Sequence, residues 1–125
     1  PGHPVIYTSS TRSLAALEFL VHVPMALAPE DLSIIEINIP DTIKRRSLNN
    51  TQLPQNWRDY PAPDELASIG TDWLKSKSSL ILNIPSAVLA EEVNVLINPL
   101  HSDLQHVRIA AIEKFSFDPR LLATR

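Results

Sequence analysis

Residues 78–99 read SSLILNIPSAVLAEEVNVLINP and contain two short apolar runs separated by a more polar bend. In the first run, 79–84, apolar side chains occupy every second position and a further one, Ile81, lies between them, which predicts a strand covered on both faces. The second run, 93–97, predicts another strand that ends at Asn98-Pro99.

Two segments near the start of the chain predict a strand followed by a helix. Residues 5–8 are mostly β-branched or aromatic and follow a proline, which indicates a buried strand. Apolar residues recur at helical spacing from 12 to about 22, and each of the hydroxyl residues 9–11 can cap the first turn. Pro24 is expected to end this helix.

Further along, the pattern predicts two more strands and a second helix. Residues 32–39 and 107–117 alternate apolar and polar side chains, as a strand with one face in the core does. Asp64 is the expected N-cap of a helix whose apolar residues continue to Trp73. Residues 42–63 are polar and hold three prolines, so we expect a long excursion with little regular structure, of the kind that often forms a functional lid.

Elements in this order predict an α+β domain with mostly antiparallel sheets and short flanking helices. The chain has 11 prolines and 2 glycines among 125 residues, which favours short elements separated by stiff turns over a helical bundle. A hydrophobic content of 44% is enough to build one core, so we expect a single domain over 1–125.

Charge and composition exclude several classes of function. The net charge is −3 and no basic run is longer than 44–46, which argues against direct nucleic-acid binding. No apolar run approaches the length of a membrane span, so we expect a soluble protein without membrane contact. The absence of cysteine removes disulfides and is compatible with a cytoplasmic location. We expect no metal site, because no carboxylate stands at metal-ligand spacing from any of the four histidines: His3, His22, His101 and His106.

Glu18 is the candidate catalytic residue with the strongest case. On the predicted helix its carboxylate falls at the edge of the apolar arc, where an unpaired charge is costly. One interpretation is an ion pair with His22, one turn further along, which contributes about 0.2–0.5 kcal/mol. The other is a carboxylate kept there for catalysis.

Ser86 follows directly on a predicted buried strand, so its hydroxyl projects from the end of a sheet, where ligand sites collect. The alternative is an N-cap for a helix over 87–92. No Gly-x-Ser-x-Gly surrounds it, which excludes a hydrolase elbow. Asn98 before a proline is interpreted as a turn residue, and Tyr7 in the predicted buried strand is interpreted as a core residue. Four arginines are either phosphate partners or surface charge: Arg12, Arg45, Arg46 and Arg58.

Taken in order, four segments resemble the RES domain, the toxin half of a bacterial toxin–antitoxin pair. They are PVIYTS at 4–9, ALEFLVH at 16–22, IPSA at 84–87 and NVLINPLH at 94–101. The resemblance covers nearly the whole chain, and the combination is far more specific than any of its parts. The family is named for an arginine, a glutamate and a serine, and Glu18 and Ser86 match the last two. In the family the arginine lies upstream, in a glycine-rich segment, so we expect 1–125 to lack an N-terminal piece.

The resemblance implies an ADP-ribosyltransferase-like fold and an enzyme that takes NAD as its substrate. Members of the family split the bond between nicotinamide and ribose, and one branch modifies a protein instead. On this basis Glu18 and Ser86 are the expected catalytic residues, and Tyr7, Thr8, Ser86 and Asn98 are expected to contact NAD, Tyr7 by stacking on the nicotinamide. A carboxylate suits this reaction because it stabilises the positive charge that develops on the ribose.

The resemblance also implies partners. We expect an Xre-type antitoxin that covers the cleft, and a homodimer of the toxin, in the bacterial cytoplasm. Three functions stay open: release of ADP-ribose to water or phosphate, transfer of ADP-ribose to a protein read by residues 42–63, and a non-catalytic module that binds the antitoxin. The resemblance leaves open whether this chain is active without the upstream arginine.

Overall fold

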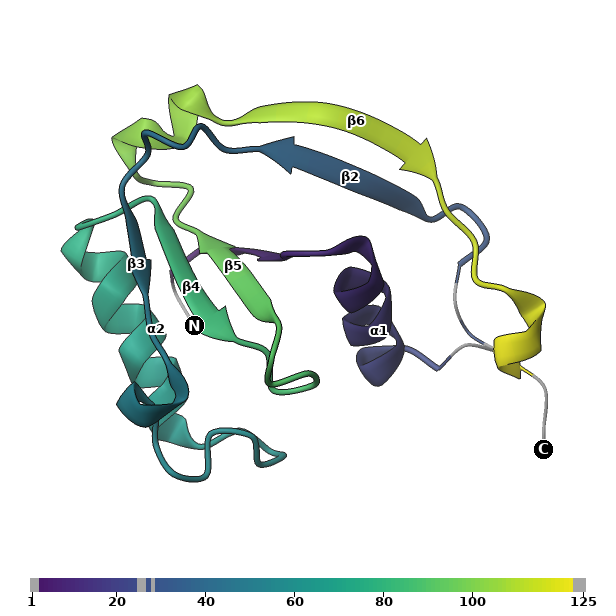
Figure 1. Cartoon of the computed structure of the whole chain (residues 1–125), viewed down its shortest axis with the longest axis horizontal. Helices are drawn as coiled ribbons and strands as arrows, with labels where there is room; N and C mark the ends of the chain where they lie inside the picture. The colour runs from purple at the N-terminus through teal and green to yellow at the C-terminus, as the bar shows by residue number, and fades with distance from the viewer. Residues whose placement is uncertain (1–2, 25–26, 28, 123–125) are drawn as a thin grey trace.

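The computed structural model describes residues 3–24, 27 and 29–122, and within them two sheets are combined with two α-helices (Figure 1). The main elements are β1 (Ile6–Ser9), α1 (Arg12–His22), β2 (Ser33–Asn38), β3 (Arg45–Ser47), α2 (Asp64–Ser76), β4 (Ile81–Pro85), β5 (Val93–Ile97) and β6 (Arg108–Lys114). Short 3-10 helices are η2 (Asn50–Gln52), η3 (Ser102–His106) and η4 (Pro119–Leu122). Residues 1–2, where the expected N-terminal piece would join, lie outside the described residues.

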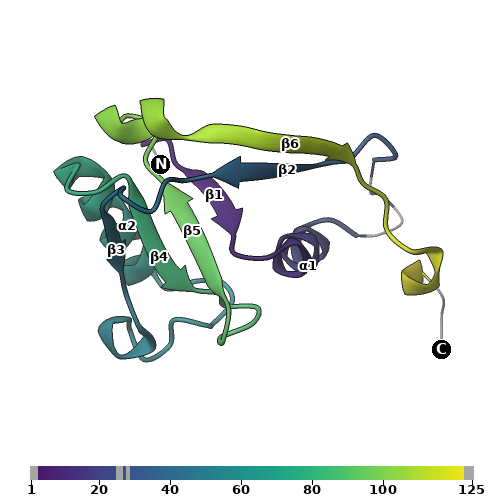
Figure 2. The ribbon, with the colours of Figure 1, turned by 45° about the horizontal axis from the view of Figure 1, so that its top comes forward.

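The larger sheet has the strand order β1-β5-β4-β3, and the smaller one pairs β2 with β6. All pairs are antiparallel except β3 with β4, which is parallel. The α+β class with mostly antiparallel sheets is therefore confirmed. Figure 2 shows β2 and β6 as a long arm that runs past the larger sheet toward α1 and η4.

One face of the larger sheet packs against α2. The buried members of this contact are Leu48, Trp73, Leu82 and Leu96. The Trp73 indole donates from Nε1 to Ser79 Oγ at 3.0 Å, and that hydroxyl donates to the carbonyl oxygen of Ile81 at 2.8 Å. The polar end of the buried tryptophan is thus fully paired, so α2 is fixed on the sheet by apolar packing and a short hydrogen-bond relay.

The opposite face of the larger sheet packs against the near end of the β2–β6 arm. Its buried members are Ile43, Leu80, Ile81 and Ile97, with Ile37, Ile39, Val95, Leu104 and Val107 around them. Ile81 and Leu82 are neighbours on β4 and belong to different clusters, because successive strand residues point to opposite faces. The predicted strand with both faces covered is confirmed.

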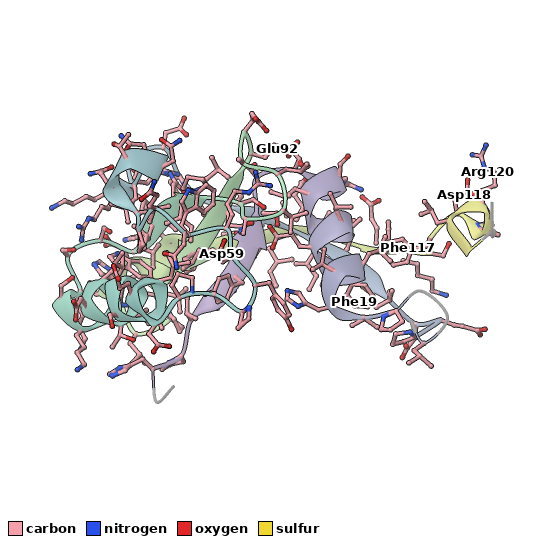
Figure 3. All side chains as sticks on the ribbon, turned by 90° about the horizontal axis from the view of Figure 1, so that it is seen from below. Phe19, Asp59, Glu92, Phe117, Asp118 and Arg120 are labelled. Carbon is pink, nitrogen blue, oxygen red and sulfur yellow. The ribbon has the colours of Figure 1, made fainter. Side chains whose placement is uncertain are left out.

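The first helix begins and ends where the sequence predicts. Thr11 is its N-cap, and its Oγ1 accepts a hydrogen bond from the amide of Leu14 at 3.1 Å. The same hydroxyl donates to Glu92 Oε1 at 2.8 Å, and Figure 3 shows Glu92 near the start of α1. Since Glu92 belongs to the bend between β4 and β5, the start of α1 is tied to that bend.

The strand β1 is not buried, contrary to expectation. It is an edge strand of the larger sheet, and the Tyr7 side chain is 68% exposed. The apolar pattern of residues 5–8 indicated a strand correctly, but edge or centre is decided by the strand order, which a local pattern does not contain. The interpretation of Tyr7 as a core residue is therefore wrong.

Residues 42–63 have little regular structure, as predicted, since they hold only the three-residue elements β3 and η2, although Ile43 and Leu48 are buried in the two cores. Two other local predictions were wrong. Asp64 is the first residue of α2, and the cap position is Pro63. Residues 87–92 form a bend without a helix. Within the described ranges, no helix has the length and apolar character needed to cross a membrane.

Candidate active site

Glu18 and Ser86 meet at one end of the larger sheet. Ser86 Oγ donates a hydrogen bond to Glu18 Oε1 at 2.8 Å, which joins residues 68 positions apart. Ser86 is fully buried and Glu18 is half-buried. Ser86 follows directly on β4 and Glu18 lies on α1, so two elements of the fold bring together two residues that the sequence singled out separately.

The hydroxyl of Ser86 has all of its hydrogen-bonding capacity in use. Its oxygen accepts from the amides of Val88 at 3.1 Å and Leu89 at 3.2 Å. A serine hydroxyl has one proton and two acceptor positions, so the proton is left for the carboxylate of Glu18. The capping hydrogen bonds are thus present, although the capped segment is a bend and not a helix, and the role of Ser86 in a site stays a prediction.

The alternative interpretation of Glu18, an ion pair with His22, is wrong. The ion pairs formed among the described residues are Arg12–Glu113, His101–Asp103 and Arg120–Asp118. The His22 side chain is exposed at the end of α1. The carboxylate of Glu18 is instead held from the sheet side by a charge-assisted hydrogen bond, which is stronger than a neutral one.

Two polar residues beside the pair were missed by sequence reasoning as members of a site. Ser9 and Asn94 lie opposite each other on β1 and β5, and Ser9 Oγ donates to Asn94 Oδ1 at 3.4 Å. Asn94 also lies opposite Ile84 on β4, two residues before Ser86. The signal that could have found them is the hairpin register, since the Ser86 amide donates to the carbonyl of Glu92, two residues before Asn94.

Tyr7 lies on the same face of the sheet as these polar residues. It is opposite Leu96 on β5, and Ser9 and Asn94 are one alternation further on. The helix α2 covers Leu96 from that face but leaves the edge strand open, which is why Tyr7 is exposed. An exposed aromatic ring at this edge is available to stack on a planar ligand, and the predicted contact with nicotinamide stays a prediction.

Thr8 points to the other face. Its Oγ1 donates to the carbonyl of Val95 at 2.7 Å, so its proton is used within the sheet. Asn98 is separated from the pair more completely, because β5 carries it about 13 Å away from Asn94. The structure does not bring Thr8 or Asn98 next to Glu18 and Ser86, and their predicted contacts with NAD stay predictions.

Asn98 builds a turn, as its structural interpretation predicted, and His101 takes part in the turn that follows. Asn98 Oδ1 accepts from the amide of Leu100 at 3.1 Å, and its Nδ2 donates to the carbonyl of Leu74 at 3.2 Å. His101 Nδ1 accepts from the amide of Asp103 at 3.0 Å. Asn98 is only 2% exposed, so both ends of its amide are satisfied inside the protein.

A cleft of about 620 Å³ beside α1 is lined by residues of β1, Tyr7 and Thr8 among them, by residues of α1 and β2, and by Phe115 and Phe117. The helix presents Ala15, Ala16 and Phe19 to it, a different side from Leu14 and Glu18. Phe19 stacks on Phe117 with ring centroids 5.8 Å apart, and both are labelled in Figure 3. The cleft is mainly apolar, and neither Glu18 nor Ser86 lines it.

Three of the four candidate arginines are already engaged by the protein. Arg12 pairs with Glu113 at 3.3 Å, and this carboxylate raises the pKa of the Arg12 guanidinium. Arg45 donates to backbone carbonyls of residues 39–43, and Arg58 donates to the carbonyls of Ala87 and Val88. All three arginines are exposed, so they are surface charges that bind other groups of the protein. In the part of the chain that the structure describes, no cluster of three or more acidic or histidine side chains could hold a metal ion.

Glu18 and Ser86 together present an oriented carboxylate at an accessible edge. Glu18 Oε1 is fixed by the serine, and no described residue donates to Oε2. Such an oxygen can accept a hydrogen bond from a ligand hydroxyl or stabilise a positive charge that forms beside it. The arrangement offers electrostatic stabilisation more readily than nucleophilic attack by serine, because the serine proton is directed at a carboxylate and no histidine base adjoins it.

A family model described as RES domain matches residues 1–118. A protein named Toxin Res from Yersinia enterocolitica is 40% identical over 122 residues, which are 96% of this chain and 79% of the relative. A Prs ADP-ribosylating toxin from a Sphingobium strain is 33% identical over 123 residues, 97% of this chain and 76% of the relative. A Toxin Res from Pseudomonas putida is 34% identical over 125 residues, 96% of this chain and 81% of the relative.

Proposed function

Because the chain belongs to the RES domain family, whose fold is ADP-ribosyltransferase-like, we propose that it is a toxin that consumes NAD by breaking the bond between nicotinamide and ribose. The observation that carries the proposal is the 2.8 Å hydrogen bond from Ser86 Oγ to Glu18 Oε1, which holds a half-buried carboxylate at the end of the sheet. The names of the relatives support the same class, since two are called toxins and the third an ADP-ribosylating toxin.

The proposed reaction breaks the C–N bond between the ribose and the nicotinamide of NAD. The bonding electrons leave with nicotinamide, which becomes neutral, and positive charge develops on the ribose carbon. The carboxylate of Glu18 stabilises this charge or holds the ribose hydroxyls, as carboxylates do in glycoside cleavage. Water then adds to the ribose carbon and releases a proton, which gives ADP-ribose. Phosphate in place of water gives the ribosyl phosphate.

Ser86 and Tyr7 each have a proposed role in this reaction. Ser86 orients the carboxylate of Glu18 through its single proton. Tyr7 stacks its exposed ring on the nicotinamide and so fixes the leaving group at the edge of the sheet. Orientation of this kind contributes to rate because the carboxylate is already in place when the charge forms.

The first test is nicotinamide release from NAD, followed by chromatography with and without phosphate. We expect release in both conditions, with ADP-ribose as the second product in the absence of phosphate. A new ribosyl phosphate in its presence identifies a phosphorylase, and its absence identifies a glycohydrolase. No nicotinamide release in either condition, from protein freed of any co-purified antitoxin, would contradict NAD cleavage.

A second function is the transfer of ADP-ribose to a cellular protein. The relative named a Prs ADP-ribosylating toxin favours this alternative. The segment around Arg58, which contacts the bend after Ser86, would then face the acceptor protein. Mass spectrometry of a cell extract incubated with isotope-labelled NAD distinguishes the two reactions, because transfer leaves a labelled protein and cleavage leaves only small molecules.

We further propose that the toxin forms a homodimer in the bacterial cytoplasm and is silenced by an Xre-type antitoxin. A non-catalytic antitoxin-binding module is the alternative of another class. Thermal unfolding with NAD distinguishes them, since a ligand at a hundredfold its dissociation constant stabilises the fold by about 2.7 kcal/mol. A melting temperature unmoved by NAD, together with a stable complex with the antitoxin, favours the non-catalytic module.

A further inference from the structure

Arg58 joins the segment before α2 to the bend that follows Ser86. Its Nε donates to the carbonyl of Ala87 at 3.0 Å, and its Nη2 donates to the carbonyl of Val88 at 3.4 Å. Figure 3 shows the next residue, Asp59, between the two helices in that view. The contact spans 29 residues of sequence and reaches the two residues that come directly after the proposed site serine.

The same bend is held from its other side by Ser86. The amides of Val88 and Leu89 donate to Ser86 Oγ, so the N–H groups of the bend point at the serine while the carbonyls of Ala87 and Val88 point at Arg58. A peptide unit is planar, so fixing the carbonyl of Ala87 also fixes the direction of the N–H of Val88. That N–H occupies an acceptor position of the serine and leaves the proton for Glu18.

We infer that Arg58 is a positioning residue, which keeps the hydroxyl of Ser86 directed at Glu18 by holding the carbonyls of the intervening bend. This inference rests on the proposed function, because the pair matters for NAD cleavage only if Glu18 is catalytic. The guanidinium suits the task because its planar fork reaches two carbonyls at once, whereas a lysine ammonium is a single point. It also lies 6.0 Å from the ring centroid of Trp57, which limits its freedom.

Kinetics of nicotinamide release test the inference. Arg58→Ala is expected to lower kcat about tenfold and to leave KM for NAD within about twofold, since no substrate contact is lost. Arg58→Lys should recover part of kcat. The matched control is Arg45→Ala, because Arg45 also donates to backbone carbonyls but lies at the opposite end of β4. We expect the kcat of this variant to be unchanged.

A double variant separates positioning from general damage. If Arg58 acts through Ser86, adding Arg58→Ala to Ser86→Ala should cost almost nothing further in kcat. A second full tenfold loss in the double variant would overturn the inference. So would a raised KM with unchanged kcat in Arg58→Ala, which is the signature of a direct contact with a phosphate of NAD.

Amide hydrogen exchange tests the contact without any turnover. In Arg58→Ala, the amides of Val88 and Leu89 should exchange about tenfold faster than in the unaltered protein, while core amides of β4 and β5 keep their protection. Unchanged exchange at both amides would overturn the inference. If the unaltered protein releases no nicotinamide but these amides respond as expected, the proposed function fails while the positioning of Ser86 by Arg58 stands.

Discussion

Ser86 and Asn98 are both polar residues that follow an apolar strand and stand beside a proline. Their side chains nevertheless bind different kinds of partner. Asn98 follows β5 and spends its amide on Leu100 and Leu74, which closes a turn and ties it to α2. Ser86 follows β4 and sends its proton across the fold to Glu18. The local sequence context is similar at the two residues, but Asn98 binds backbone groups and Ser86 binds a carboxylate.

The two ends of the β4–β5 pair differ in where the side-chain hydrogen bonds finish. We call the Asn98 end closed, because its bonds finish on backbone groups, and the Ser86 end open, because its bonds finish on a carboxylate. At the Asn98 end the buried side chain donates to the carbonyl of Leu74 on α2 and accepts from the amide of Leu100 in the turn. At the Ser86 end the relay of hydrogen bonds finishes on a carboxylate whose second oxygen receives no donor from the described residues. A polar network that ends on an unsatisfied, accessible charge is suited to a ligand, whereas one that closes on itself is suited to stability.

The largest expected effect comes from Glu18→Gln. Glutamine keeps an oxygen that can accept from Ser86, so the change removes the negative charge with little change in shape. We expect kcat for nicotinamide release to fall about 10³-fold, with an unchanged melting temperature. Glu65→Gln, an exposed carboxylate in the first turn of α2, is the control. A loss of less than threefold in Glu18→Gln would remove Glu18 from the mechanism.

Asn98→Ala tests the closed end of the comparison. The change leaves the amide of Leu100 and the carbonyl of Leu74 without their buried partner, so we expect a loss of about 2–3 kcal/mol in the free energy of unfolding. Nicotinamide release per folded molecule should be unaffected. Urea denaturation measures the first quantity, and KM for NAD checks the second. A raised KM in a folded variant would restore Asn98 as a contact of NAD.

Ser86→Ala should lower both kcat and the free energy of unfolding, each by less than the two preceding variants do. The amides of Val88 and Leu89 lose their acceptor, for which we expect about 1–2 kcal/mol of lost stability. The carboxylate of Glu18 loses its orienting donor, and kcat should fall about tenfold. Unfolding curves and kinetics on the same preparation separate the two. Full activity in a destabilised variant would reduce Ser86 to a capping residue.

The smallest effect is expected for Tyr7→Ala. The ring is exposed on an edge strand, so its loss should change the free energy of unfolding by about 0.5 kcal/mol or less. Its stacking role predicts a rise of about fivefold in KM for NAD, and Tyr7→Phe should behave like the unaltered protein. Equal KM values in Tyr7→Ala and the unaltered protein would argue against stacking.

Local patterns predicted the elements well where the deciding interactions are close in sequence. The helix from Arg12 to His22 depends on a Thr11 cap three residues from its partner, and the two-faced strand shows as apolar residues on both sides of β4. The exposure of Tyr7 and the burial of Ile43 and Leu48 were missed, because each depends on which strand lies next to which.

The candidate site was predicted in part. Glu18 and Ser86 were singled out by their positions at the edge of a helix arc and at the end of a strand, and by the family resemblance. Their direct hydrogen bond could not be predicted from spacing, because it joins residues 68 positions apart. The contact of Arg58 with the bend after Ser86 was missed for the same reason, since no local pattern distinguishes this arginine from a solvated one.

The central claim is that Glu18 and Ser86 act as one unit in NAD cleavage. A double-mutant cycle on kcat for nicotinamide release, with Glu18→Gln, Ser86→Ala and the two combined, tests it most directly. If the serine acts only by orienting the carboxylate, the combined variant should be no slower than Glu18→Gln alone. Losses that multiply, to about 10⁴-fold in the combined variant, would contradict the account and show that the two residues act independently.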